Sequence, residues 1–376
     1  ALPEGAITAE ASDVLGDTSI QIVVEVMGGE HPAYEYVKEA LFRGRYVVTA
    51  NKEIMAKHGP ELLALAAEKG VELFYEASVG GGIPIISPLK RDLSANELKS
   101  LRAIINGTTN YILTRMDKEG LDFNEALRQA QALGYAEADP TNDVEGHDAV
   151  YKLAILAGLA FRTAVRPEAI FREGITRISS RDFRYARELG YAIKLLAVAR
   201  RDPEGRVQAR VHPTLLAEDE LLAKVEGVLN AVEVEGDLMG KVLFQGPGAG
   251  ASPTTSSVMA DVLDAAQAIC SGRPAWKWAF SDSLALKPMA DLITRYYIRI
   301  MVVDRPGVLA GIARCFGVND VSIASVIQKE SDEASQTAEL VIMTHPAREE
   351  AVQSTMRALE QLDVVHEIGN FLRVED

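Results

Sequence analysis

The chain has 376 residues, of which 48% are hydrophobic and 25% charged, a composition typical of a folded globular protein that excludes disorder and collagen. Its 39 Lys and Arg against 54 Asp and Glu give a net charge of −15, which repels polyphosphates and excludes nucleic acid as an expected partner. The two cysteines, Cys270 and Cys315, match no metal or disulfide pattern, and no apolar run reaches the ~18 residues of a membrane span. We therefore expect a cytoplasmic protein of roughly two to three domains with no membrane partner.

The first 80 residues alternate short apolar strands with helices. Strands are predicted at Ile20–Val26, Tyr46–Thr49 and Val71–Tyr75, and helices at Tyr34–Phe42 and Pro60–Lys69. Unbroken apolar strands in this order are typical of a parallel sheet covered on both faces. Ligands of such sheets bind beyond the carboxyl ends of the strands, which here carry Met27-Gly28-Gly29, Asn51-Lys52 and the loop from Ala77 to Gly82.

From Ile83 to about Gly250 the pattern changes to longer helices and alternating strands, which predicts a mixed or antiparallel sheet with helices on one side. The predicted strands are Leu98–Ile105, Phe171–Ile178, Lys194–Arg200, Gln208–Pro213, Gly227–Glu235 and Lys241–Gln245. A closing helix is predicted at Pro253–Ser271, followed by a linker in which Trp276 and Trp278 are interpreted as packing anchors.

The segment from Tyr296 to Val374 forms a third unit. Its predicted order is strand, helix, strand, strand, helix, strand, which is the ferredoxin-like arrangement. Asp304 is expected to cap the first of these helices, and Pro306 suits its first turn. We expect this unit to have a hydrophobic core separate from that of the preceding residues.

The most informative stretch runs from Gly134 to Gly158. Asp148 and Lys152 are four residues apart, which places them on one helix face, and an exposed ion pair is the plain alternative. The residues after Tyr151 read KLAILAGLAF, in which Lys152 is the only polar side chain, so the helix is expected to be largely buried. A buried lysine needs a paired anion or a cleft, which makes Lys152 a candidate general acid or base.

Three other segments are weaker candidates. Asn106-Gly107-Thr108-Thr109-Asn110 follows a strand and is either a simple helix cap or a carboxylate-binding turn. Glu76 with Gly80-Gly81-Gly82 is either a loop crossing between domains or a carboxylate beside free carbonyls that holds a monovalent cation. The stretch Phe244–Thr255 brings glycine-rich backbone towards the closing helix.

Together, the stretches VVEVMGG, TANKE, EASVGGGIPII, INGTTNYI, GYAEADPTNDVEGHDAVYKLAILA and GPGAGASPT resemble homoserine dehydrogenase of the bacterial type over about Ile20–Ser271. The unit from Tyr296 onward resembles an ACT domain, with DRPGVLAGIA as its signature. The resemblance implies α/β and α+β architecture: a partial Rossmann-like parallel sheet, a mixed-sheet catalytic and dimerisation domain, and a C-terminal ferredoxin-like ACT domain. The implied boundaries are 1–80 with 251–272, then 81–250, a linker at 273–294, and 295–376.

The resemblance also implies the activity and its residues. The reaction is the NAD(P)H-dependent interconversion of L-aspartate 4-semialdehyde and L-homoserine, with Lys152 as general acid/base, Asp148 and Glu137 holding the substrate, and Lys52 near substrate and nicotinamide. The remaining implied residues are Asp143, Tyr135 and Thr109 for substrate, Gly28, Gly134 and Gly250 for cofactor, and Glu76, Val79, Gly81 and Ile83 for Na⁺. The resemblance also implies a homodimer or homotetramer. It further implies an amino-acid effector, threonine, bound where the turn Asp304–Leu309 meets the segment from Asn319 to Ile323 of a paired ACT domain.

One departure from the family pattern is large. The chain contains no G-x-G-x-x-G motif, so we expect that the first strand–helix unit of the cofactor domain is missing ahead of Ala1 and that the chain alone is inactive. The alternative is a non-catalytic amino-acid sensor that uses the dehydrogenase core as a dimerisation scaffold. A non-catalytic sensor would not need Lys152, Asp148 and Glu137 together, so their joint occurrence favours the enzyme.

Overall fold

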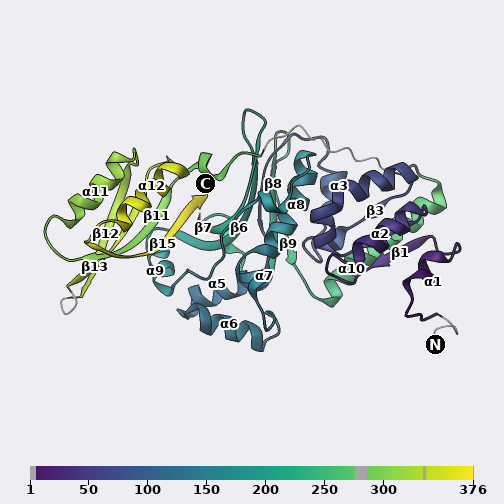
Figure 1. Ribbon diagram of the computed structural model, residues 1–376, viewed down its shortest axis with the longest axis horizontal. Helices are drawn as coiled ribbons and strands as arrows, with labels where there is room; N and C mark the ends of the chain where they lie inside the picture. Colours follow the sequence, from purple (N-terminus) through teal and green to yellow (C-terminus); the bar gives the residue numbers. More distant parts are fainter. Residues whose placement is uncertain (1–5, 276–285, 333–335, 376) are drawn as a thin grey trace.

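The computed structural model describes residues 6–275, 286–332 and 336–375, so Trp276 and Trp278 lie outside the described residues. Its N-terminal unit is a parallel three-stranded sheet in the order β1 (Ile22–Glu25), β2 (Tyr46–Thr49), β3 (Leu73–Phe74). The flanking helices are α1 (Ala11–Gly16), α2 (Ala33–Phe42), α3 (Lys52–Lys69) and α10 (Ala251–Ser271). Helix α10 returns from late in the chain to contact β1 and β2, and Figure 1 shows this late segment in the same unit as the N-terminal strands. The predicted parallel sheet is confirmed.

Helix α3 begins eight residues earlier than the sequence predicts, at Lys52 instead of Pro60. The side chain of Asn51 accepts hydrogen bonds from the backbone N–H groups of Glu53 and Ile54, which satisfies two of the donors that a helix start leaves open. Pro60 is therefore inside the helix. As a result, Lys52 is the first helical residue after a strand end instead of part of a loop.

The central unit is built on long antiparallel strands. They are β4 (Leu98–Ile104), β6 (Tyr191–Arg201), β7 (Val207–Ala217), β8 (Leu229–Gly236) and β9 (Gly240–Pro247), with the short β5 (Phe171–Arg172) parallel to β7. The helices are α4 (Ile86–Lys90), α5 (Gly107–Glu119), α6 (Phe123–Ala132), α7 (Thr141–Val144), α8 (His147–Phe161) and α9 (Ser180–Glu188), and single 3₁₀ turns lie at Glu76–Ser78, Pro167–Ala169 and Leu222–Lys224. Helix α8 packs against β4, β6 and β7 and is buried along nearly its whole length, as predicted.

The predicted strand Phe171–Ile178 is mostly wrong, because only Phe171 and Arg172 pair in the sheet. After them the chain turns away to pack on the α7–α8 turn, where the N–H of Ile175 donates to the carbonyl of Val144 at 2.9 Å. Gly174 allows this approach, since a Cβ there would lie 2.5 Å from the Val144 carbonyl oxygen.

The C-terminal unit has the predicted ferredoxin-like order. It comprises β11 (Tyr296–Val303), α11 (Val308–Val318), β12 (Ile323–Asp332), β13 (Thr337–Thr344), α12 (Glu349–Glu360) and β15 (Val365–Glu375), with β10 (Ile293–Thr294) and β14 (Ala347–Arg348) as a small extra pair and a 3₁₀ turn at Met289–Asp291. The expected cap by Asp304 is wrong. Helix α11 begins after Gly307, which has φ of 91° and no side-chain cap, while the N–H of Asp304 donates to Gln336.

The expectation of a separate C-terminal core is wrong on one face of its sheet. The residues Tyr296, Ile298, Ile312, Phe316 and Leu359 form a core with α11 and α12. On the other face, Tyr297, Val341, Met343, Leu372 and Val374 belong to the same hydrophobic core as the central unit. Successive side chains of a strand point to opposite faces of the sheet, so the C-terminal sheet contributes to two hydrophobic cores, one on each face.

The two sheets also join edge to edge. The last residues of β15 pair parallel with β7 through Arg373↔Thr214, Val374↔Leu215 and Glu375↔Leu216, which makes one ten-stranded sheet in the order β12-β13-β11-β15-β7-β6-β4-β8-β9, with β5 attached to β7. Figure 1 shows β15 lying beside β7. Among the described helices, none has the length and apolar character needed to cross a membrane.

We predict that Asp182 holds the C-terminal unit on the central one. It is fully buried on α9 and accepts hydrogen bonds from Arg299 (2.7 Å), Tyr297 (3.1 Å) and Asn370 (2.9 Å). Asp182→Asn would remove one of the two anions paired with the buried guanidinium of Arg299, leaving Glu339 at 3.0 Å, and should lower the free energy of unfolding by about 3–5 kcal/mol, measured by chemical denaturation.

The matched control is Glu188→Gln, on the same helix. Glu188 pairs with Lys329 of the C-terminal unit at 2.6 Å, but the two side chains are 35% and 55% exposed, so the loss should be about 0–1 kcal/mol. Equal losses for the two variants would contradict the role given to Asp182.

Candidate active site

Two strand ends and one helix turn meet around the carboxylate of Asp148. Lys52 follows β2, Asn106 follows β4, and Asp148 and Lys152 lie on the first turns of α8. Because both strand ends and α8 are buried, these side chains are held by packed elements and not by free loops. Lys52 and Asp148, which form a direct contact, lie 96 residues apart in the sequence.

Asp148 is the centre of this cluster, with its side chain only 4% exposed. Its Oδ1 accepts from the ammonium of Lys52, and its Oδ2 accepts from Lys152 Nζ at 2.8 Å and Asn106 Nδ2 at 2.9 Å. Burial alone would favour the neutral acid, but the charges of Lys152 and Lys52 outweigh it and hold the pKa of Asp148 well below its ordinary value. Asp148 is therefore an anion throughout the neutral pH range.

The side chain of Lys152 is 12% exposed, which confirms the predicted buried pair with Asp148. Its ammonium donates to Asp148 and, at 2.8 Å, to the backbone carbonyl of Ile105. An ammonium group has three donors, so these two bonds fix its direction and leave one N–H for another acceptor. Lys152 is also one of the residues that line the cleft described below.

Lys52 is more open, with 44% of its side chain exposed. Burial lowers the proton affinity of Lys52. The negative charge of Asp148 and the hydrogen bond that Lys52 donates to it, together with the charges of Asp143 and Glu137, nevertheless hold the pKa of Lys52 above its ordinary value. Lys52 therefore remains a cation.

A cleft of about 250 Å³ opens where the carboxyl ends of β1, β2 and β3 face the glycine-rich turn before α10. Its lining includes Gly28, Gly29, Asn51, Lys52, Ser78, Gly81, Lys152, Gly248 and Thr254. A Cβ on Gly81 would lie 2.6 Å from the carbonyl group of Gly248, so the two loops approach more closely than side chains would allow. Gly250, the N-cap of α10, is adjacent to this lining.

The predicted site residues divide into those at the cleft or in the cluster around Asp148 and those on an exposed loop outside the cleft. Gly28, Lys52 and Lys152 line the cleft, with Gly250 beside it and Asp143 and Asp148 in the cluster around Asn106. Thr109 is buried, and its hydroxyl donates a hydrogen bond to Oδ1 of Asn106, so it helps to fix the orientation of the Asn106 side chain. Gly134, Tyr135 and Glu137 lie on the exposed loop after α6, where the ring of Tyr135 packs 5.1 Å from that of Tyr111. None of these three is among the cleft-lining residues described.

Sequence reasoning left the Asn106–Asn110 segment as either a helix cap or a carboxylate-binding turn, and it did not predict that the amide of Asn106 itself binds two carboxylates. Its Oδ1 accepts from the N–H of Thr109 at 2.8 Å, which caps α5, while its Nδ2 donates to Asp143 at 2.7 Å and to Asp148. Burial and the nearby negative charge of Asp148 raise the pKa of Asp143 above its ordinary value. The hydrogen bond that Asp143 accepts from Asn106 lowers this pKa but does not cancel the rise. The motif INGTTNY predicts a helix cap at Asn106, but a cap does not show which groups the side-chain amide nitrogen of Asn106 contacts.

Glu76 is buried, and its carboxylate accepts three backbone hydrogen bonds, from Ile85 (2.6 Å), Ile86 (2.7 Å) and Ser87 (2.7 Å) at the start of α4. The carbonyl of Gly81 accepts from the hydroxyl of Ser257 at 2.6 Å. Within the described residues, no group of three or more His, Cys, Asp or Glu side chains is arranged to hold a metal ion.

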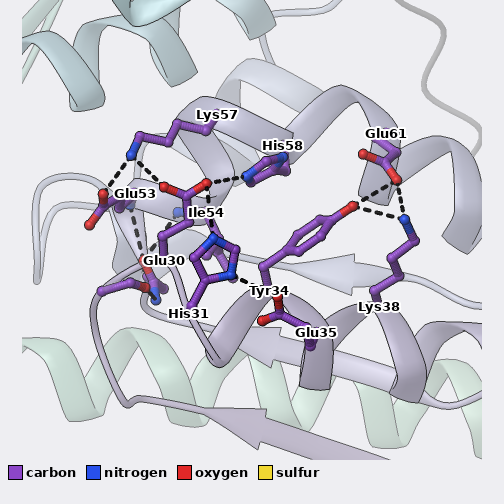
Figure 2. Close-up of polar contacts among 12 residues, drawn as sticks. Glu30, His31, Tyr34, Glu35, Lys38, Glu53, Ile54, Lys57, His58 and Glu61 are labelled. Atoms are coloured by element: carbon purple, nitrogen blue, oxygen red, sulfur yellow. Dashed lines mark hydrogen bonds and ion pairs between the residues drawn. The ribbon is translucent and has the colours of Figure 1, made fainter.

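A polar network beside the cleft holds the Gly28-Gly29 loop in place (Figure 2). Glu30 accepts from Lys57 at 2.6 Å and contacts the ring of His58 at 2.8 Å, both on α3, and Asn51 Nδ2 donates to the carbonyl of Gly29 at 2.7 Å. The hydrogen bonds from Lys57 and His58 lower the pKa of Glu30 to about 2. The loop after β1 is therefore tied to the helix that carries Lys52.

A parallel sheet whose strand ends face a cleft, with an ion-paired lysine in the cleft wall, defines an α/β protein that binds a small-molecule ligand at that edge and carries an additional C-terminal unit. Three family models match the chain: "Homoserine dehydrogenase, NAD binding domain" at residues 1–76, "Homoserine dehydrogenase" at 84–263, and "ACT domain" at 296–364. The chain belongs to the homoserine dehydrogenase family and is an oxidoreductase. The ACT match supports the ferredoxin-like C-terminal unit described above.

Known relatives agree with this assignment over nearly the whole chain. A homoserine dehydrogenase from Neisseria gonorrhoeae is 42% identical, and the match covers 99% of this chain and 87% of the relative. The crystal structure of a homoserine dehydrogenase from Thiobacillus denitrificans superposes with a TM-score of 0.92 at 44% identity, covering 98% of this chain and 85% of that one. A hyperthermophilic archaeal homoserine dehydrogenase in complex with NADPH gives a TM-score of 0.61 at 32% identity, covering 69% and 76% of the two chains. A nicotinamide cofactor is therefore supported, and the expectation that a segment is missing ahead of Ala1 stays a prediction.

We predict that Asn106 sets the geometry of the two carboxylates. Asn106→Asp keeps the oxygen that caps α5 but replaces the amide donor by a third carboxylate, so kcat should fall roughly 10–100-fold, as measured by steady-state kinetics. Asp122→Ala is the control, because Asp122 caps the neighbouring α6 through the N–H of Glu125 and touches neither carboxylate. An unchanged kcat in Asn106→Asp would exclude this positioning function.

Proposed function

We propose that Lys152 transfers the proton in the interconversion of L-aspartate 4-semialdehyde and L-homoserine. The observation that carries the proposal is the ammonium of Lys152 at the cleft wall, fixed by Asp148 and the Ile105 carbonyl with one donor left over. The bound nicotinamide supplies or accepts the hydride. In the direction of reduction, Lys152 donates its free N–H to the aldehyde oxygen as negative charge develops there, and in oxidation the neutral amine takes the proton from the hydroxyl.

Lys52 and the acidic side chains position the substrate in this proposal. Lys52 lines the same cleft and shares the carboxylate of Asp148 with Lys152, so its remaining donors can bind the substrate carboxylate. Glu137 and Asp143 contribute negative charge near Lys52, and with Asp148 they form the proposed partners of the substrate ammonium. Tyr135 and Thr109 complete the proposed substrate set.

The cofactor is proposed to lie along the cleft. Gly28 presents backbone after β1, and Gly250 precedes the N-terminus of α10, whose first N–H groups suit a phosphate. Gly134 belongs to the proposed set through the family resemblance. We propose a Na⁺ ion beside Glu76, with the carbonyls of Val79, Gly81 and Ile83 as the further ligands that the family resemblance suggests. Glu76 Oε2 accepts one N–H, from Ser87, and keeps a lone pair for a cation.

The proposed division of the chain follows the packing. Residues 1–80 with 251–272 form the cofactor domain, since α10 contacts β1 and β2, and 81–250 form the substrate and dimerisation domain. Residues 295–376 form the regulatory domain after a linker at 273–294. A homodimer or homotetramer is proposed, supported by the β8–β9 hairpin at the sheet edge, where Leu238 is 77% exposed. A cytoplasmic location is supported by the free thiols of Cys270 and Cys315.

Regulation by an amino acid is proposed for the ACT domain, with threonine as the effector. The turn Asp304–Leu309 is the position that the sequence resemblance suggests. Its backbone includes Gly307 at the start of α11, where N–H groups of the first helical turn can donate hydrogen bonds to a carboxylate.

We predict that Lys152→Ala lowers kcat by roughly 10²–10⁴-fold, because the reaction loses its proton donor. Steady-state turnover of homoserine by the active enzyme is the measurement. Lys118→Ala serves as the control, since Lys118 forms an exposed ion pair with Glu226 away from the cleft. A Lys152 variant that retains more than half of wild-type turnover would remove this residue from the mechanism.

Glu137→Gln should raise the KM for homoserine about tenfold, because the substrate ammonium loses a charged partner. The matched control is Asp139→Asn on the same loop, whose carboxylate accepts from the hydroxyl of Thr141 at 2.6 Å. The KM in the control should stay near the wild-type value. If the two variants shift KM equally, Glu137 does not bind the substrate.

A further inference from the structure

Asn230, on β8, carries a buried side-chain amide that has no hydrogen-bond partner among the described residues. Only 1% of the residue is exposed, and both Nδ2 and Oδ1 are without a partner. Other buried side chains with an unpartnered atom, such as Asn110 and Glu339, form hydrogen bonds through their second polar atom. Burying an amide without partners is costly, so this side chain requires a physical explanation.

The amide of Asn230 lies against the glycine-rich turn that forms one wall of the active-site cleft. Asn230 pairs with Gly246 in the β8–β9 ladder, and Gly248, two residues further on, lines the cleft. A Cβ on Gly248 would lie 1.9 Å from Asn230 Nδ2 and 2.1 Å from its Cγ, so the amide fills the space that a side chain at position 248 would need. The backbone of Gly248 therefore contacts both this amide and the loop that contains Gly81.

The second neighbour of this amide is the start of α5. A Cβ on Gly107 would lie 3.6 Å from Asn230 Oδ1. Gly107 directly follows Asn106, whose Nδ2 donates to Asp143 and Asp148. Asn230 thus lies between the turn on the cofactor side of the cleft and the helix start on the substrate side. Both neighbours present backbone N–H and C=O groups, which are suitable partners for an amide.

We propose that Asn230 is a positioning residue that holds the turn 248–250 in its cofactor-bound arrangement. When the dinucleotide occupies the cleft, the glycine-rich turn shifts its backbone, and the amide of Asn230 then bonds a carbonyl and an N–H of that turn. The proposal rests on the cofactor placement proposed above and adds a residue that does not itself touch the cofactor. Because these bonds form only in the bound state, they contribute to cofactor affinity and not to the stability of the free enzyme.

The test replaces the amide by an apolar group of similar shape, Asn230→Leu, in the active enzyme. NADPH and NADH are titrated separately by nicotinamide fluorescence, and Tm is measured with and without each. The Kd and KM of the cofactor that the enzyme uses should rise at least about tenfold, with kcat within about twofold of wild type. The Tm of the free variant should not fall, and its rise on adding cofactor should be smaller than in wild type.

Asn230→Ala covers the case in which leucine does not fit beside Gly248, and it should raise the Kd as much. The matched control is Asn96→Leu, at the other end of the same hairpin. Asn96 Oδ1 accepts from the N–H of Met239 at 3.0 Å, and its Nδ2 donates to the carbonyl of Leu93 at 3.2 Å. These bonds exist in the free enzyme, so Asn96→Leu should lower Tm and leave the Kd unchanged.

An unchanged Kd in both Asn230 variants would overturn the proposal. It would equally be overturned if the free Asn230→Leu enzyme lost as much Tm as Asn96→Leu, because the amide would then have partners without cofactor. Gly248→Ala separates this result from the proposed function, since the added Cβ would overlap Asn230 and should weaken cofactor binding. Weaker binding in Gly248→Ala alone overturns only the function of Asn230. Unchanged binding in all three variants, with normal turnover, would also overturn the placement of the cofactor along this turn.

Discussion

The ion triplet of Lys52, Asp148 and Lys152 is the interaction on which the rest of the structure depends. A carboxylate with 4% of its side chain exposed would be costly to bury alone, and two ammonium groups with the amide of Asn106 satisfy it. Lys52 comes from the parallel sheet and Lys152 from the central unit. The same contacts therefore stabilise Asp148, fix the direction of Lys152 and bring the two units together at the cleft.

The close contact between glycine loops adds a second constraint on that cleft. Gly81 and Gly248 approach at distances that a Cβ would prevent, and Gly248 itself packs against the side chain of Asn230. The backbone of the cleft is consequently fixed by packing from three directions: β3, the turn before α10 and β8. Such fixed backbone is what a reaction that needs hydride and proton at one carbonyl group requires.

The C-terminal unit is part of the main sheet as well as a domain with its own core. Buried pairs such as Arg210–Glu375 and Arg373–Glu349 lie at the junction, where an unpaired partner would be strongly destabilising. A C-terminal domain attached in this way differs from one on a flexible linker, because its β15 contacts Glu173 next to the α7–α8 turn. Changes in its packing have a short, continuous route to Asp143.

Much of this protein was readable from local sequence. The parallel strands, the ferredoxin-like order and the buried helix with Asp148 and Lys152 follow from apolar periodicity and from spacing within one element. Tertiary structure alone decided that Lys52 reaches Asp148, that the amide of Asn106 joins two carboxylates, that Phe171–Ile178 leaves the sheet after two residues, and that β15 pairs with β7. The physical reason is the range of the interactions: periodicity records which face of an element is buried, whereas contacts between residues far apart in the chain depend on how the elements pack.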